Sequence, residues 1–118
     1  MLKIDSTTQG ITLTRGDSAE LQLSIKDADN NDYDFSNDTV KFGVKRSALD
    51  TTPAMLVKEF DENGKIYFDP DDTKSMQFGD YLYDVTVYHT ETDAEENEVT
   101  TVCTVINAAR FTLAWNVL

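Results

Sequence analysis

The side chains best suited to nucleophilic catalysis in this sequence are its one histidine, His89, and its one cysteine, Cys103. A thiol or hydroxyl becomes a nucleophile near neutral pH when a histidine accepts its proton and a carboxylate orients that histidine. No local catalytic signature surrounds either residue, so a Cys-His or Ser-His-Asp arrangement would have to assemble in space. The alternative is that His89 simply ends a strand. We therefore expect that the protein is not an enzyme and has no catalytic residues.

The polar segment Asp27–Asp38 contains oxygen ligands with a spacing that suits a metal ion. Asp27, Asp29 and Asn31 have the spacing with which a calcium loop begins. The match then fails, because Asp32 stands where the loop needs glycine and Asp38 where it needs a bidentate glutamate. A turn-rich connection is the preferred interpretation, since Asx side chains bond their own backbone. One histidine and one cysteine make no zinc site, and the five glycines form no phosphate loop. We expect neither metal nor cofactor.

Arg15-Gly16-Asp17 is the tripeptide that integrins bind. It also lies between two alternating segments, where a tight turn needs a residue with positive φ, and glycine supplies that conformation without strain. Three residues recur often by chance, so we interpret Arg15–Ser18 as a turn and not as an adhesion motif.

Length and charge restrict the class of protein. The 118 residues fit one domain, 1–118, and the composition is that of a folded chain, with 40% hydrophobic and 27% charged residues. The formal charge of -12 repels phosphate and anionic lipid, so we expect no nucleic acid and no membrane as partner. One cysteine permits no internal disulfide, and no export signal or apolar membrane segment is visible. We expect synthesis and folding in a cytoplasm.

The elements that would position these groups are strands, and the clearest runs from Phe78 to Tyr88. Its apolar residues recur every second position, which places them on one face of a central strand (Tyr81, Tyr83, Val85 and Val87). Met76, Gly79 and Tyr81 also have the form of a tyrosine corner, in which a phenol at the start of a strand bonds back to upstream backbone. The alternative is that Tyr81 is one more core aromatic.

Further alternating segments predict the remaining strands: Ile11–Thr14, Ala19–Lys26, Val40–Val44, Met55–Phe60, Lys65–Phe68, Val99–Ile106 and Arg110–Leu113. Asn63-Gly64 predicts a hairpin between Met55–Phe60 and Lys65–Phe68. Pro70, with Asp69 as its cap, predicts a short helical turn. The fold class expected is all-β, an immunoglobulin-like antiparallel β-sandwich of about seven to nine strands with one short helical turn.

Near the C-terminus, Val99–Ile106 is β-branched and apolar enough to predict a well-buried strand, with Cys103 as a half-buried thiol. Thr90–Asn97 before it is acidic and predicts a solvated hairpin loop, and Asn107–Ala109 after it predicts a bulge. The last apolar residues, Trp115, Val117 and Leu118, either fold onto the rim of the sandwich or form a tail that docks on a partner. Met1–Ile4 is a second apolar terminal segment.

Several of these segments, in this order and spacing, resemble small phage and prophage virion proteins, and most closely the immunoglobulin-like N-terminal domain of the phage baseplate upper protein family. The resemblance extends from about Ile11 onwards. It rests on Arg15-Gly16-Asp17 before a strand, Tyr33–Ser36 before Val40–Phe42, Gly64–Ile66 with Pro70 and Asp72-Thr73, Gly79–Val85, and Arg110–Leu113.

The resemblance implies a β-sandwich that attaches to other virion proteins, and the family has no catalytic residues to carry over. The family adds receptor-binding parts downstream, whereas this sequence ends at Leu118, which implies a docking, decorating or joining role. The expectation is a non-enzymatic structural protein of a tailed bacteriophage virion, a head-decoration, fibre-attachment, neck or baseplate component made in the bacterial host cytoplasm. Its expected partners are other virion proteins and further copies of itself, in a homo-oligomer or a symmetric array. The alternative is a free-standing β-sandwich module that binds a carbohydrate or a host protein.

Overall fold

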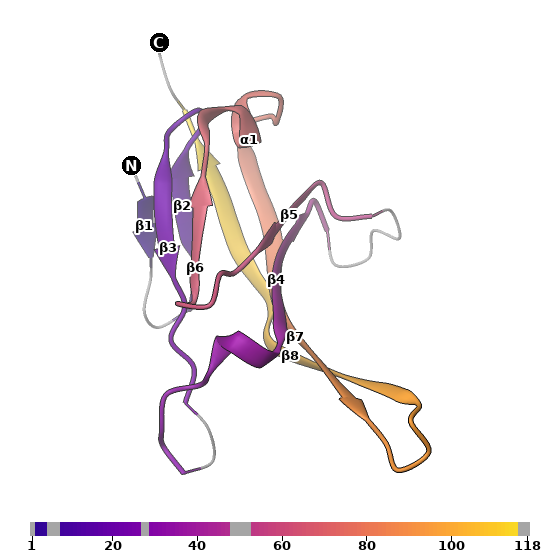
Figure 1. Ribbon diagram of the computed structural model, residues 1–118. Coiled ribbons are helices and arrows are strands. Elements are labelled where there is room, and N and C mark those ends of the chain that lie inside the picture. Colours follow the sequence, from indigo (N-terminus) through magenta and orange to yellow (C-terminus); the bar gives the residue numbers. More distant parts are fainter. Residues whose placement is uncertain (1, 5–7, 27–28, 48–52, 116–118) are drawn as a thin grey trace.

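The structure is a computed structural model that describes residues 2–4, 8–26, 29–47 and 53–115. The described residues form eight strands, a 3-10 turn and one short helix (Figure 1). In chain order these are β1 Leu2–Ile4, β2 Ile11–Thr14, β3 Ala19–Gln22, η1 Phe35–Asn37, β4 Thr39–Lys45, β5 Leu56–Glu59, β6 Lys65–Phe68, α1 Pro70–Lys74, β7 Gly79–Thr92 and β8 Glu98–Ala114.

The strands form two layers. Six of them make a curled sheet in the order β1-β2-β8-β7-β4-β5, and β3 and β6 make a small second sheet that covers part of one face. The β2–β8 pair is parallel and the other pairs are antiparallel. The all-β sandwich expected from the alternating pattern is therefore confirmed, with one short helix.

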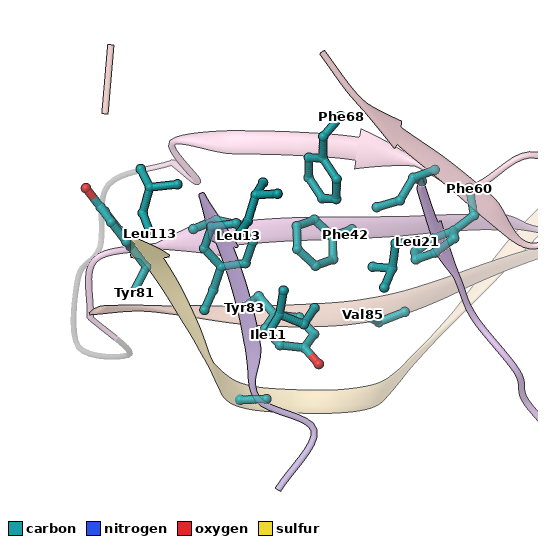
Figure 2. Close-up of a cluster of buried hydrophobic side chains, with 14 of the residues drawn as sticks. Ile11, Leu13, Leu21, Phe42, Phe60, Phe68, Tyr81, Tyr83, Val85 and Leu113 are labelled. Atoms are coloured by element: carbon teal, nitrogen blue, oxygen red, sulfur yellow. The ribbon is translucent and has the colours of Figure 1, made fainter. Parts of the chain in front are cut away.

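The core fills the space between the two sheets (Figure 2). Strand β7 lies between β8 and β4, and its alternate residues Tyr81, Tyr83, Val85 and Val87 are buried, as the period of two predicts. The ring of Phe42 on β4 contacts three other aromatic rings, those of Phe68, Tyr83 and Phe111, at centroid distances of 5.6, 5.1 and 6.0 Å. Each fully buried aromatic of this kind stabilises the fold by about 1.5–3 kcal/mol through loss of apolar surface from water.

The hairpin predicted at Asn63-Gly64 is wrong, although the turn itself forms. Gly64 has φ of +75°, and the Asp61 N–H donates to the Lys65 carbonyl at 2.9 Å. However, β5 pairs with β4 in the large sheet, whereas β6 pairs with β3 in the small one. The chain crosses between the layers at the buried side chain of Phe60. The chain also changes sheets at the Arg15–Ser18 turn, because β2 belongs to the large sheet and β3 to the small one.

The burial predicted for Val99–Ile106 is also wrong. Val99 is 50% exposed and Val102 57% exposed, and the Cys103 thiol is exposed and not half-buried. The reason is geometric: this half of β8 extends past the small sheet, so only β7 lies beside it (Figure 1). The described chain measures 57 × 31 × 24 Å, and its radius of gyration of 15.7 Å exceeds the roughly 13.5 Å typical of a compact domain of this length.

The extension begins where β8 bends. The β7–β8 register shifts twice, between the pairs Tyr83–Ala109, Val85–Ile106 and Thr86–Thr104, so β8 carries one extra residue at each shift. The first shift lies at the predicted bulge, where Ala108 has φ of +51° and its N–H donates to the Asp84 carboxylate. Bulges bend a strand and increase its twist. We call the two-stranded part beyond them, residues 89–101, the ribbon.

Candidate docking surfaces

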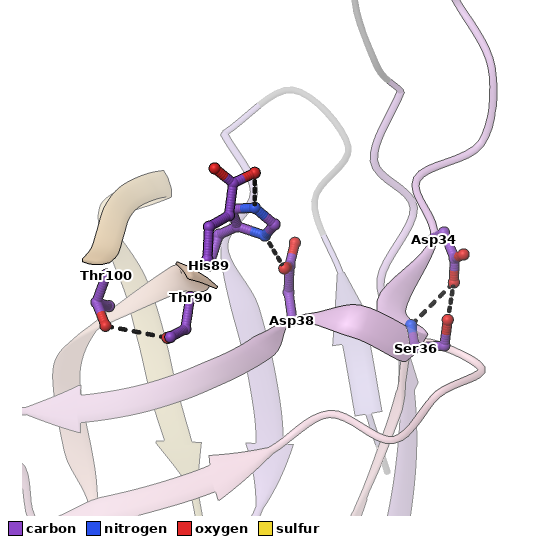
Figure 3. A network of polar contacts seen from close by, with 7 residues as sticks. Asp34, Ser36, Asp38, His89, Thr90 and Thr100 are labelled. Atoms are coloured by element: carbon purple, nitrogen blue, oxygen red, sulfur yellow. Dashed lines mark hydrogen bonds and ion pairs between the residues drawn. The ribbon is translucent and has the colours of Figure 1, made fainter. Parts of the chain in front are cut away.

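His89 lies at the base of the ribbon between two carboxylates (Figure 3). Its Nδ1 contacts the Asp38 carboxylate, and its Nε2 lies 2.8 Å from a carboxylate oxygen of Glu91. Both hydrogen bonds favour the imidazolium and raise the pKa of His89 above 6.5, and the bond to Asp38 is the larger cause. A thiol or hydroxyl nucleophile would have to displace one of these carboxylates. The geometry therefore gives His89 a structural role, joining the ribbon to the chain just before β4.

The acidic segment that resembles the start of a calcium loop is only partly described, because Asp27 lies outside the described residues. Asp32, which occupies the position where the calcium loop needs glycine, pairs with Lys26. The Tyr33 N–H donates to the Ile25 carbonyl at 2.9 Å, which closes a turn. In the described part of the chain, no group of three acidic, histidine or cysteine side chains is arranged so that it could hold a metal ion. No helix among those residues is long and apolar enough to span a membrane.

The predicted tyrosine corner has a definite geometry. Met76 and Tyr81 are buried, Gly79 has φ of +134°, and the Tyr81 hydroxyl donates to the Gln77 carbonyl at 2.7 Å. A phenol at the start of β7 thus bonds to backbone four residues upstream, the contact that defines such a corner. It fixes the segment that enters β7.

Sequence reasoning missed a second tyrosine contact of the same kind. The Tyr83 hydroxyl donates to the Gln9 carbonyl, in the segment before β2. Burial raises the pKa of the Tyr83 phenol, because the phenolate would lose its hydration. Gln9 has φ of +63°, which no local sequence signal indicates. Tyr81 and Tyr83 therefore attach two different connections to the same strand.

At the end of the sandwich opposite the ribbon, the Arg15–Ser18 turn is attached to both α1 and β8. The Gly16 N–H donates to the hydroxyl of the fully buried Thr73 at 2.8 Å, and the Arg15 N–H donates to the Ala114 carbonyl at 3.1 Å. Gly16 has φ of +83°, as the turn prediction requires. The first turn of α1 is held by Asp72, whose carboxylate accepts the Asp69 N–H at 2.7 Å.

This end carries a stack of two aromatic rings and one guanidinium group, in which Phe78 and Arg15 are half-buried and Trp115 is exposed. The Trp115 ring stacks on Phe78 with centroids 3.9 Å apart and an interplanar angle of 24°, and the Arg15 guanidinium carbon lies 4.3 Å from the centre of the Phe78 ring. Trp115 nevertheless remains 76% exposed. We call Arg15, Phe78 and Trp115 the aromatic end. Of the predicted tail, Trp115 alone is described, since Val117 and Leu118 lie outside the described residues.

Of the two alternatives for the tail, the packing of Trp115 against the rim of the sandwich is seen. Docking on a partner stays a prediction, for which most of the Trp115 surface is open. Sequence reasoning identified Trp115 but not its supports, because nothing local connects Arg15 and Phe78 to a residue at the end of the chain. A second arginine adds to this region, since the Arg46 guanidinium carbon lies 5.7 Å from the centre of the Tyr81 ring.

A groove of about 430 Å³ lies on the outer face of the large sheet. Its lining combines Lys41 and Lys45 with Asp84, Leu82 and one aromatic ring, that of Tyr88. The Lys41 ammonium lies 5.3 Å from the centre of that ring. Carbohydrate sites usually present open aromatic faces, and here the one ring of the groove is half-buried with a cation over it.

No protein-family model, curated protein or solved structure matches this chain. What these surfaces can do therefore follows from their own residues.

Proposed function

We propose that this protein is a non-enzymatic structural component of a tailed bacteriophage virion, which acts by docking to other virion proteins in the head, neck or baseplate. The observation that carries the docking role is Trp115, a large aromatic that is held in one orientation while 76% of its surface is exposed. The virion setting comes from the sequence resemblance to the baseplate upper protein family.

The chemistry of the aromatic end suits a binding surface. Tryptophan and arginine are the residue types that most often dominate the binding energy of protein interfaces. Stacking on Phe78 fixes the Trp115 ring before any partner arrives, so little side-chain freedom is lost on binding. The supports of this ring are themselves fixed, because the Arg15 backbone is bonded to β8 and the adjacent Gly16 to α1.

Charge favours a protein partner over other classes. The net charge of -12 opposes binding to nucleic acid and to anionic lipid. The aromatic end contributes a cation, Arg15, to an otherwise acidic molecule, and aromatic surface that water solvates poorly. An apolar or acidic patch on a neighbouring virion protein would complement it.

Mass spectrometry of purified particles from the source phage, with peptide counting, tests the proposal. A structural component is expected at a fixed ratio to the other structural proteins that survives particle purification. If the chain accumulates in infected cells but is missing from purified particles, the virion role is wrong. The free-standing module that binds a carbohydrate or a host protein would then replace it.

A further inference from the structure

The β8 strand leaves a long edge without a neighbour. Strand β2 pairs with β8 only from Phe111 to Ala114, whereas β7 pairs with β8 along nearly its whole length. Among the described residues, no strand therefore lies on the other side of residues 98–110. Their outward N–H and C=O groups are available to a further strand.

This edge lacks the features that normally prevent strand addition. Proteins protect open edges with charged side chains, with proline or with very short strands. The other edge strands follow that rule, with Lys3 on β1, Glu20 on β3, Lys58 on β5 and Lys65 on β6. From Val99 to Ala109, in contrast, β8 contains no charged residue and no proline. Only the two bulges interrupt it, and they leave the seven residues Glu98–Thr104 in regular register with β7.

An additional strand would stabilise the ribbon, which beyond the end of β4 has two strands only among the described residues. An isolated two-stranded hairpin is marginal in water, and independent stability takes about three strands. Besides the backbone ladder, the hydroxyls of Thr90 and Thr100 form a hydrogen bond of 3.0 Å between the ribbon's strands (Figure 3). Val99 in the ribbon and Val102 just outside it on β8 are β-branched residues that suit a sheet, but they are half or more exposed. The side chains of a neighbouring strand would cover part of each from the side.

We propose that residues 98–104 of β8 pair antiparallel with the same residues of a second copy of this chain, with Thr101 opposite Thr101. The two ribbons then form one continuous four-stranded sheet, β7-β8 of one protomer followed by β8-β7 of its partner. This inference does not depend on the virion role, since it uses a different surface from the aromatic end.

Charge explains why a second copy fits in this direction. The tip of the ribbon carries five carboxylates (Glu91, Asp93, Glu95, Glu96 and Glu98) and no lysine or arginine. A parallel pair would bring two such tips together. In the antiparallel pair the tips lie at opposite ends of the ladder, about 20 Å apart, which is more than two Debye lengths at physiological salt. The residues that meet around the symmetry axis, 99–103 of each copy, are uncharged.

The register follows from backbone geometry. Directly opposite residues in an antiparallel ladder point to the same face and have the same hydrogen-bonding orientation, so the symmetry axis passes through a residue position. Centring on Thr101 uses the whole regular segment of both copies. It places Thr101 opposite Thr101, a favourable cross-strand pair, and sets Val99 of one protomer opposite Cys103 of its partner and Thr100 opposite Val102, which are uncharged. The pairing is isologous, so it closes at a dimer and does not continue into a fibre.

Disulfide trapping tests the register directly. The single cysteine makes Cys103→Ser a cysteine-free background, into which Thr101→Cys or Thr100→Cys is introduced. Two residues at position 101 would have Cα atoms about 4.5–5.5 Å apart, within disulfide range. Two residues at position 100 would be about 8 Å apart, which is too far. Mild oxidation is expected to give a covalent dimer from the first variant and little from the second.

Sedimentation equilibrium of the unmodified chain and of Thr101→Lys completes the test. We expect a dimer that Thr101→Lys weakens about fivefold or more, because two like charges would then face each other. Thr92→Lys, on the other strand of the ribbon and without the Thr90–Thr100 hydrogen bond to lose, is the matched control and should leave the dimer unchanged. Circular dichroism establishes that each variant is folded. A monomeric wild-type chain, or a dimer that survives Thr101→Lys without preferential trapping at position 101, would overturn the proposal.

Discussion

At the residue scale, two tyrosines and one histidine decide how the connections attach to the central strand. Tyr81 and Tyr83 both lie on the core face of β7, and both direct a hydroxyl to a backbone carbonyl outside the strand. His89 continues the same face into the ribbon, where it meets carboxylates in place of carbonyls. The two hydroxyls and the imidazole, on an otherwise apolar face of β7, thus attach three separate segments of the chain to this strand.

Replacing Tyr81 with phenylalanine should lower the free energy of unfolding by about 1–2 kcal/mol, because the Gln77 carbonyl would lose its hydrogen bond in a partly buried site. Urea denaturation measures the change. Tyr83 cannot serve as the control, since it makes its own bond to Gln9. Tyr67 is the suitable one, because it is 53% exposed, and Tyr67→Phe should be nearly silent. Equal effects in the two variants would refute a corner at Tyr81.

His89 makes the stability of the protein depend on pH. Its folded pKa is raised above the ordinary value of 6.5, first by the hydrogen bond to Asp38 and then by the bond to Glu91. The folded state therefore binds the proton more tightly than the unfolded state. The stabilisation is complete below pH 6.5 and is lost as the pH rises through the folded pKa.

The thermal unfolding midpoints of wild type and of His89→Gln are compared from below pH 6.5 into the alkaline range. We expect wild type to be the more stable at pH 6 and the difference to diminish as the pH rises into the alkaline range. Asp38→Asn should reduce the pH dependence too, because it removes the larger cause of the shift. A constant difference between wild type and His89→Gln at all pH values would contradict the assignment.

At the element scale, the sequence predicts which segments form strands better than which strands pair. The alternation in β4 and β7, the cap of α1 and the bulge before Arg110 are local signals, and each appears in the structure. The prediction of a hairpin at Asn63-Gly64 failed because a turn with positive φ reverses the chain but does not determine which strand the next segment pairs with. The prediction that Val99–Ile106 is buried failed because β-branched residues favour a strand whether or not another layer covers it.

The Asn63-Gly64 turn is nevertheless required by its surroundings. A Cβ at Gly64 would lie 2.8 Å from Cε2 of Phe35 and 3.0 Å from the Leu23 carbonyl oxygen, at φ of +75°. Gly64→Ala should therefore destabilise the protein by about 1–3 kcal/mol. Gly43→Ala is the matched control, since its Cβ would meet Ala54 at an ordinary 3.6 Å, and it should change stability by less than about 0.5 kcal/mol. Similar denaturation midpoints for the two variants would rule out a packing role for Gly64.

At the scale of the whole molecule, the two candidate interaction surfaces lie at opposite ends of a 57 Å body (Figure 1). The aromatic end is formed by three distant parts of the chain, so no sequence pattern could have assembled it. The ribbon projects from the other end and carries the acidic tip. A molecule with one self-pairing end and one end that docks elsewhere could join copies of itself to a larger particle.

The docking role of the aromatic end is tested most directly by the incorporation of Trp115→Ala into phage particles, compared with Tyr67→Ala. Tyr67 is also an exposed aromatic, on β6, but it stacks on no other ring of the described residues. Loss of a binding hot spot costs about 2–4 kcal/mol, so the amount of Trp115→Ala in purified particles should fall at least tenfold while its melting temperature changes little. Tyr67→Ala should be incorporated like wild type. Equal incorporation of folded Trp115→Ala and Tyr67→Ala would contradict the assignment of the aromatic end as the docking surface.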